Sequence, residues 1–109
     1  VGATQQELQA VGVPYAQGVA RYEDLAKAAI AGDEHGLLSL LFEPNSGYLL
    51  GVHIIGDQAC ELIHIGQAVM AHNGTIAYFV DSTFNFPTLA EAYRIAALDG
   101  LRNAGGGPA

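Results

Sequence analysis

The segment FNFPTLAEAYR, near the end of the chain, places a glutamate three residues after a threonine. A carboxylate such as Glu91 could serve as a general acid or base in catalysis. The Thr88-x-x-Glu91 spacing also matches a capping box, in which the glutamate bonds to the backbone at a helix start. On that interpretation Glu91 contributes about 1 kcal/mol to stability and does no chemistry. Phe84 and Phe86 would then pack on the core.

A second group of reactive side chains lies in QACELIHIGQAVMAHN. Glu61 and His64 are three residues apart and Cys60 and His64 are four apart, so one helix could present two metal ligands. A metal site needs three or four ligands, and the sequence spaces no second cluster to complete one. We therefore expect no metal, and predict that these residues contact solvent or a partner.

Other reactive residue types lack the surroundings that their chemistry needs. Gly56 precedes an expected helix, but neither GxGxxG nor a following Lys-Ser/Thr is present, so no nucleotide-binding loop is predicted. Ser39, Ser46 and Ser82 are not in a GxSxG setting. His53 lies on an expected strand, opposite to its neighbours, which predicts a polar sheet face; a pH switch is the alternative.

Composition excludes several classes of function. The 109 residues predict one domain, and the net charge of −7 with only four Lys or Arg argues against nucleic-acid binding. No apolar run approaches the ~20 residues of a membrane span. Lone Cys60 indicates a reducing compartment, which we take to be the cytoplasm. A charged fraction of only 14% suggests that part of the surface is buried against a partner.

Periodicity predicts an α+β fold, an antiparallel sheet with helices packed on one face. Strands are expected at 36–43 and 48–55, joined as a hairpin by the PNSG turn, with a further extended segment after Pro14. The first expected helix is capped by Thr4 and Glu7 and ends at Gly12. A second helix is expected from a cap at Asp57 to Asn73-Gly74, and a short one after Thr75. The last expected helix runs from Pro87 or Thr88 toward Asn103. Residues 1–103 form the expected domain and 104–109 a flexible tail.

Three segments in this order resemble the C-terminal dimerisation domain of the pyridine nucleotide–disulfide oxidoreductases. LLGVHIIGDQACELI resembles that domain's strand–turn–helix, and FPTLAE matches the family's His-Pro-Thr-x-x-Glu. VGATQQELQAVGVPY resembles the start of the domain just after its first strand, so we expect that strand to be truncated in this sequence. The resemblance covers nearly all of the chain up to about Asn103.

The resemblance implies a role for the FPTLAE segment. In the family's disulfide reductases, the His-Pro dipeptide reaches the flavin and disulfide of the other subunit, and the Glu orients the acid–base His. Phe86 occupies the His position and cannot carry a proton, so no catalytic residue is expected in this chain. Phe86 and Pro87 would instead pack toward the partner-subunit FAD.

This departure implies the branch of the family that moves hydride between NADPH and NAD through FAD, without a thiol. The alternatives are a dihydrolipoamide dehydrogenase-like flavoprotein lacking the catalytic His, and a freestanding dimerising scaffold. In the first two cases FAD, NAD(H) and NADP(H) bind the full-length parent, and this chain alone is inactive and binds no cofactor. A homodimer is expected, with interface residues Gly66, Ala68, Val69, Met70, Phe84 and Glu91.

Overall fold

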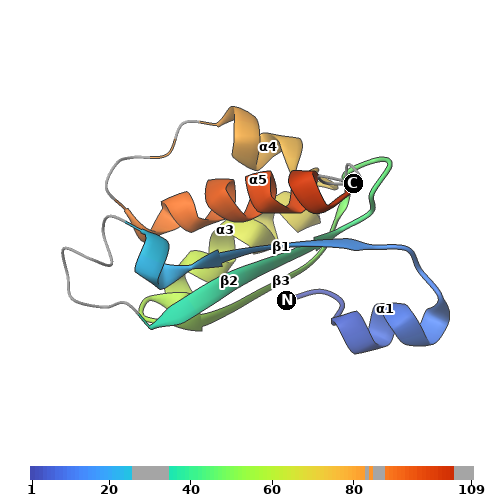
Figure 1. Ribbon diagram of the computed structural model, residues 1–109, viewed down its shortest axis with the longest axis horizontal. Coiled ribbons are helices and arrows are strands. Elements are labelled where there is room, and N and C mark those ends of the chain that lie inside the picture. Colours follow the sequence, from blue (N-terminus) through green and yellow to red (C-terminus); the bar gives the residue numbers. More distant parts are fainter. Residues whose placement is uncertain (26–34, 83, 85–87, 105–109) are drawn as a thin grey trace.

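The computed structural model describes residues 1–25, 35–82, 84 and 88–104. Three antiparallel strands form one sheet in the order β1-β2-β3, and α3, α4 and α5 lie on one side of it while α1 stands apart (Figure 1). Helix α5 packs on β1 and β2, and α3 packs on β3. This arrangement confirms the expected α+β class. The elements are α1 (Gln5–Val11), β1 (Ala16–Arg21), the 3-10 turn η1 (Tyr22–Asp24), β2 (Gly36–Phe42), β3 (Leu49–Gly56), α3 (Ala59–Ala71), α4 (Ala77–Asp81), the 3-10 turn η2 (Leu89–Glu91) and α5 (Ala92–Ala104).

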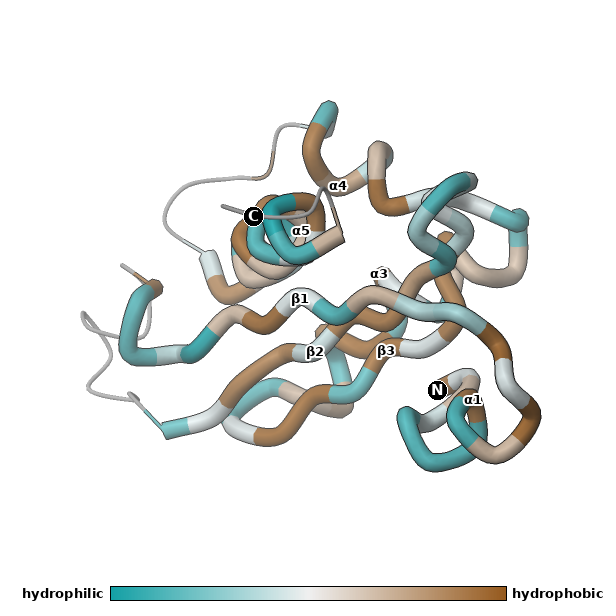
Figure 2. The backbone as a smooth tube through the Cα atoms, turned by 45° about the vertical axis from the view of Figure 1, so that its right-hand side comes forward, coloured by the Kyte–Doolittle hydropathy of each residue, from teal (hydrophilic) through white to brown (hydrophobic). Residues whose placement is uncertain are grey.

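The hairpin of β2 and β3 forms the centre of the core, as its apolar pattern predicts. Leu38 and Leu40 are fully buried on the helix-covered face, and Figure 2 shows hydrophobic residues recurring along both strands. On the opposite face Ser39 pairs with His53, whose Nε2 lies 2.8 Å from the Ala3 carbonyl oxygen. His53 therefore points away from the core and contacts the backbone of the N-terminal segment.

The first helix forms as its end signals predict. The Glu7 amide donates to Thr4 Oγ1 at 3.2 Å and the Thr4 amide donates to Glu7 Oε1 at 3.0 Å, which completes a capping box. Gly12 ends the helix with φ of 74°, a left-handed conformation that glycine adopts without steric cost. Both predicted ends of α1 are confirmed.

The expected cap of α3 is wrong. Gln58, and not Asp57, is the N-cap residue; it has φ of 62° and no side-chain capping bond. Asp57 belongs to the preceding turn, where its carbonyl accepts a hydrogen bond from the Tyr22 hydroxyl at 2.7 Å. A left-handed residue between strand and helix shifts the helix start by one position, and residue type alone does not reveal such a shift.

Helix α5 and strand β1 touch through their backbones. A Cβ atom at Gly18 would lie 1.9 Å from the Ala96 carbonyl oxygen and 2.6 Å from the Gly100 amide nitrogen. At Gly100 a Cβ atom would lie 2.5 Å from the ring of Phe42. Glycine at both positions is therefore what lets the helix rest directly on the edge strand.

Side chains of α5 also bond to the free edge of β1. Asp99 Oδ2 accepts the Val19 amide at 2.9 Å, and Asn103 Nδ2 donates to the Gln17 carbonyl at 2.8 Å. Burial raises the pKa of Asp99, but hydrogen bonds from the Val19 amide and Arg102 outweigh it, so the pKa lies below its ordinary value of 3.8. These contacts satisfy strand groups that an open edge would leave unpaired.

Within the described ranges, no helix combines the length and the apolar character needed to cross a bilayer.

Replacing Gly18 with alanine should destabilise the chain by at least about 2 kcal/mol, because the new methyl group meets rigid backbone and α5 must move away. Gly12→Ala is the matched control: nothing lies within 4 Å of its position, so only the left-handed conformation costs about 1 kcal/mol. Urea unfolding measures the free energy of unfolding of both variants. An equal decrease in the two variants would contradict the close approach of β1 and α5.

Asp99 should make stability fall in acid. Its folded-state pKa lies below the ordinary 3.8, so its contribution is complete above that value and is lost as the pH falls through the folded-state pKa. Urea unfolding should show a higher free energy of unfolding for wild type than for Asp99→Asn near neutral pH, and this difference should shrink below about pH 4. A difference in unfolding free energy that does not change with pH would show that the Asp99 carboxylate does not cause it.

Candidate functional site

Thr88 and Glu91 form the capping box that their spacing predicts. The Thr88 amide donates to Glu91 Oε1 at 3.2 Å, and the Thr88 side chain bonds to the backbone in return. The turn η2 then leads directly into α5. The carboxylate of Glu91 is thus bonded to the helix start, which confirms the capping interpretation. Phe86 and Pro87, predicted to pack toward a flavin, lie outside the described residues.

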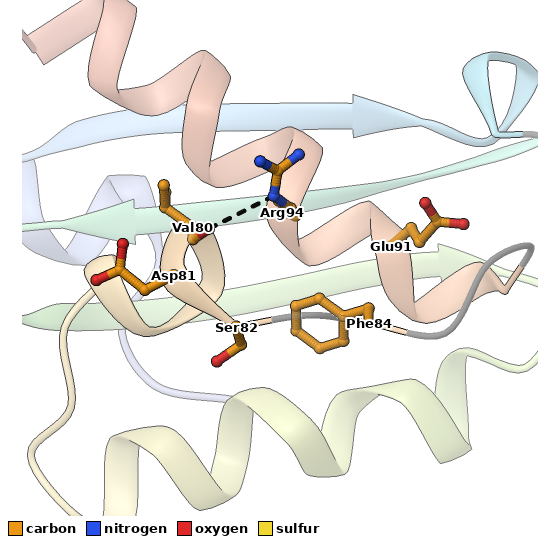
Figure 3. A pocket seen from close by; sticks show the side chains of 6 residues that line it. All are labelled: Val80, Asp81, Ser82, Phe84, Glu91 and Arg94. Carbon is orange, nitrogen blue, oxygen red and sulfur yellow. Dashed lines mark hydrogen bonds between the residues drawn. The ribbon is translucent and has the colours of Figure 1, made fainter.

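A pocket of about 360 Å³ opens beside this helix start. It is lined by Val80, Asp81, Ser82, Phe84, Glu91 and Arg94. In Figure 3 Arg94 lies opposite the ring of Phe84, with Asp81 and Glu91 on either side, and its Nε donates to the Val80 carbonyl at 3.4 Å. These described side chains pair an aromatic surface with polar groups of both signs. These side chains suit packing against a partner surface.

A second, more apolar pocket of about 250 Å³ involves α3 and α4. Its lining includes Ala68 and Val69, two predicted interface residues, together with His72, Gly74 and Tyr78. Tyr78 is 50% exposed and Ala68 is also exposed. We call these five residues the α3–α4 groove. An exposed apolar groove on a chain of low charge is typical of a surface that a partner covers.

Two other predicted interface residues face the subunit's own interior. Gly66 is buried, and a Cβ atom there would lie 2.7 Å from Val52 of β3. The methyl group of Met70 packs beside Gly2. The small size of Gly66 thus serves the approach of α3 to its own sheet, whereas Ala68 and Val69 lie at the groove.

Cys60, Glu61 and His64 are exposed along α3. The Nδ1 atom of His64 lies 3.0 Å from Gln67 Oε1 on the same helix. Within the part of the chain that the structure describes, no three His, Cys, Asp or Glu side chains gather as metal ligands would.

Tyr93 is a residue that the sequence interpretation missed. Its side chain is fully buried and stacks on Phe79, with ring centroids 4.9 Å apart. The hydroxyl accepts the Gly66 amide at 3.0 Å and donates to the Leu62 carbonyl. Burial raises the pKa of Tyr93 to about 12, against the lowering effect of the Gly66 amide. A tyrosine on the inner face of a helix needs a polar partner, which is the signal that could have found it.

Comparison with known proteins agrees with this architecture. The chain matches the family described as pyridine nucleotide-disulphide oxidoreductase, dimerisation domain, over residues 1–97. It is 56% identical over 104 residues to the soluble pyridine nucleotide transhydrogenase of Hahella chejuensis, covering 93% of this chain and 22% of that protein. It is 54% identical over 99 residues to the enzyme of the same name from Mycobacterium tuberculosis, covering 91% and 21%. The chain therefore spans about a fifth of these relatives' length.

Solved structures share the fold at lower identity. The HOCl-induced flavoprotein disulfide reductase RclA from Escherichia coli superposes with a TM-score of 0.84 at 19% identity, over 90% of this chain and 22% of that one. LpdA from Mycobacterium tuberculosis gives a TM-score of 0.83 at 20% identity, over 90% and 21%. Together with the family match over residues 1–97, the sheet and its helices establish that this chain belongs to the pyridine nucleotide–disulfide oxidoreductase family, as its dimerisation domain.

Proposed function

We propose that the whole protein is an FAD-dependent transhydrogenase that moves hydride between NADPH and NAD, and that this chain holds its two subunits together. The proposal rests on which residues stand in the FPTLAE segment and what they bond to. Phe86 replaces the family's histidine, and the carboxylate of Glu91 is occupied by the helix cap. A proton relay to a thiol therefore lacks its base. Identity of 56% to a soluble pyridine nucleotide transhydrogenase supports the same assignment.

The cofactors and the residues of this chain have different roles in the proposed enzyme. FAD and the nicotinamides supply the hydride chemistry when they are bound in the whole protein. Phe86 and Pro87 are apolar, which suits packing against a flavin and the exclusion of water. The cap formed by Thr88 and Glu91 fixes the start of the helix that follows them. This chain alone would be inactive, would not retain FAD, and the whole protein would work in the cytoplasm.

We assign the subunit interface to the α3–α4 groove and to the segment that carries Phe84 and Glu91. Both regions present pockets at the surface, and α4 connects them, because Tyr78 lines the first and Val80 and Asp81 line the second. Residues 1–103 would form the domain that dimerises, with Gly66 and Met70 supporting α3 from inside. A two-fold axis would place each groove against its symmetry-related copy.

The whole protein should pass hydride from NADPH to an NAD analogue and should not reduce lipoamide or glutathione disulfide. The reason is that Phe86 cannot exchange a proton with a thiol. Steady-state spectrophotometry with each acceptor measures both activities. The isolated chain is the control and should be colourless after gel filtration and inactive. Efficient turnover of either disulfide would refute the assignment and favour a dihydrolipoamide dehydrogenase-like function.

Ala68→Glu should weaken the dimer of the whole protein by several kcal/mol, because a two-fold interface buries the new charge twice. Sedimentation equilibrium of wild type and variant at matched micromolar concentration gives the dissociation constants. Ala10→Glu is the matched control, since Ala10 is an exposed alanine within α1, which stands apart from the groove. An Ala68→Glu dimer as tight as wild type would discard the groove as interface. A monomeric wild type would discard the dimer itself.

A further inference from the structure

The Tyr93 hydroxyl occupies a pair of backbone groups that normally bond to each other. In a regular α-helix the amide of residue 66 donates to the carbonyl of residue 62. Here the Gly66 amide donates to Tyr93 Oη at 3.0 Å, and the hydroxyl donates onward to the Leu62 carbonyl. A side chain of α5 thus bonds to both groups of one backbone pair of α3.

The surroundings hold this hydroxyl in place. Tyr93 is 0% exposed and its ring stacks on Phe79 of α4. Gly66 packs against the isopropyl group of Val52 of β3, which occupies the space that a Cβ atom would need. The donor and acceptor positions are therefore fixed from three elements, α4, α5 and β3. A pKa of about 12, raised by burial, keeps the hydroxyl protonated and able to donate at neutral pH.

This hydroxyl supplies two bonds by which α5 holds α3 at this point. The bonded pair, Leu62 and Gly66, ends two residues before Ala68, an exposed residue of the groove. On the other helix, Tyr93 follows the capping residue Glu91 by two positions. One hydroxyl therefore joins the two surface regions that we assign to the subunit interface.

We propose that Tyr93 is a positioning residue whose hydroxyl fixes α3 to α5 at Gly66, and thereby the placement of the α3–α4 groove relative to the Phe84–Glu91 segment. Without the oxygen, α3 loses both bonds to α5 at this point, α3 shifts against α5, and the groove no longer matches its symmetry-related copy. The effect on dimerisation rests on the interface proposed above, whereas the effect on α3 does not.

The test is Tyr93→Phe in the whole protein, a change that keeps the ring and its stack on Phe79 and removes one oxygen. Tyr22→Phe is the matched control. Tyr22 is also 0% exposed and its hydroxyl donates to a backbone carbonyl, that of Asp57. Tyr22→Phe loses the bond to Asp57 and Tyr93→Phe loses two bonds, each worth about 1 kcal/mol, so both variants should melt below wild type.

Two measurements distinguish a positioning role of the Tyr93 hydroxyl from a contribution to folding stability alone. Sedimentation should show the dimer dissociation constant about tenfold higher in Tyr93→Phe and within about twofold of wild type in Tyr22→Phe; tenfold corresponds to about 1.4 kcal/mol. Amide NMR resonances of residues 64–70 should shift in Tyr93→Phe, while those of α1 stay in place. p-Aminophenylalanine at position 93, which restores a donor at the same site, should recover the wild-type dimer constant.

Equal dimer constants in the two phenylalanine variants, unshifted resonances at 64–70, or failure of the p-aminophenylalanine rescue would each overturn the proposal. These outcomes are distinct from failure of the proposed function. A monomeric wild type removes the interface and its dependence on Tyr93, and the NMR shifts then decide the effect on α3 alone. A normal wild-type dimer with an unaffected Tyr93→Phe dimer removes only the role of the hydroxyl.

Discussion

The direct contact between the backbones of Gly18 and Gly100 determines where the other parts of this domain can lie. It holds α5 against the edge strand with no side chain in between. Tyr93 and Gly100 are seven residues apart and share one face of the helix, about 10.5 Å along its axis. Fixing one end of α5 on β1 therefore fixes how far the Tyr93 hydroxyl reaches toward α3. The bonds of Asp99 and Asn103 to β1 then prevent the helix from sliding or turning.

Signals local in the sequence predicted the elements well. Two apolar runs of strand length joined by the PNSG turn located the hairpin, and the Thr-x-x-Glu spacing located the starts of α1 and of the last helix. Each of these depends on residues within one turn or one strand pair. The cap at Asp57 failed because Gln58 adopts a left-handed conformation, which is uncommon for a residue other than glycine and carries no sequence mark.

Contacts between distant segments were not predictable in the same way. Gly66 was interpreted as a small residue for a partner, yet its neighbour is Val52 of the same subunit. Gly18 and Gly100 are separated by 82 positions, and neither stands in a turn motif that would single it out. A glycine needed for close approach looks like any other glycine until its neighbour is known. Tyr93 differs, because a buried hydroxyl always requires a partner, and only the partner's identity was hidden.

The chemistry proposed for the whole protein gives a reason for the rigid support that this domain provides. Hydride transfer depends steeply on the placement of the reacting atoms, and a displacement of about 1 Å can cost a hundredfold in rate. In the proposed dimer, Phe86 and Pro87 reach a flavin that belongs to the other subunit, so errors in the subunit interface become errors at the flavin. The capping box at Thr88 and Glu91, the Tyr93 hydroxyl and the glycine contact lie in series between that segment, α3 and the sheet. The capping box and the Tyr93 hydroxyl each bond a side chain to backbone, and the glycine contact brings two backbones together with no side chain between them. On the proposed function, Phe86 would lack the acid–base role and keep the mechanical one.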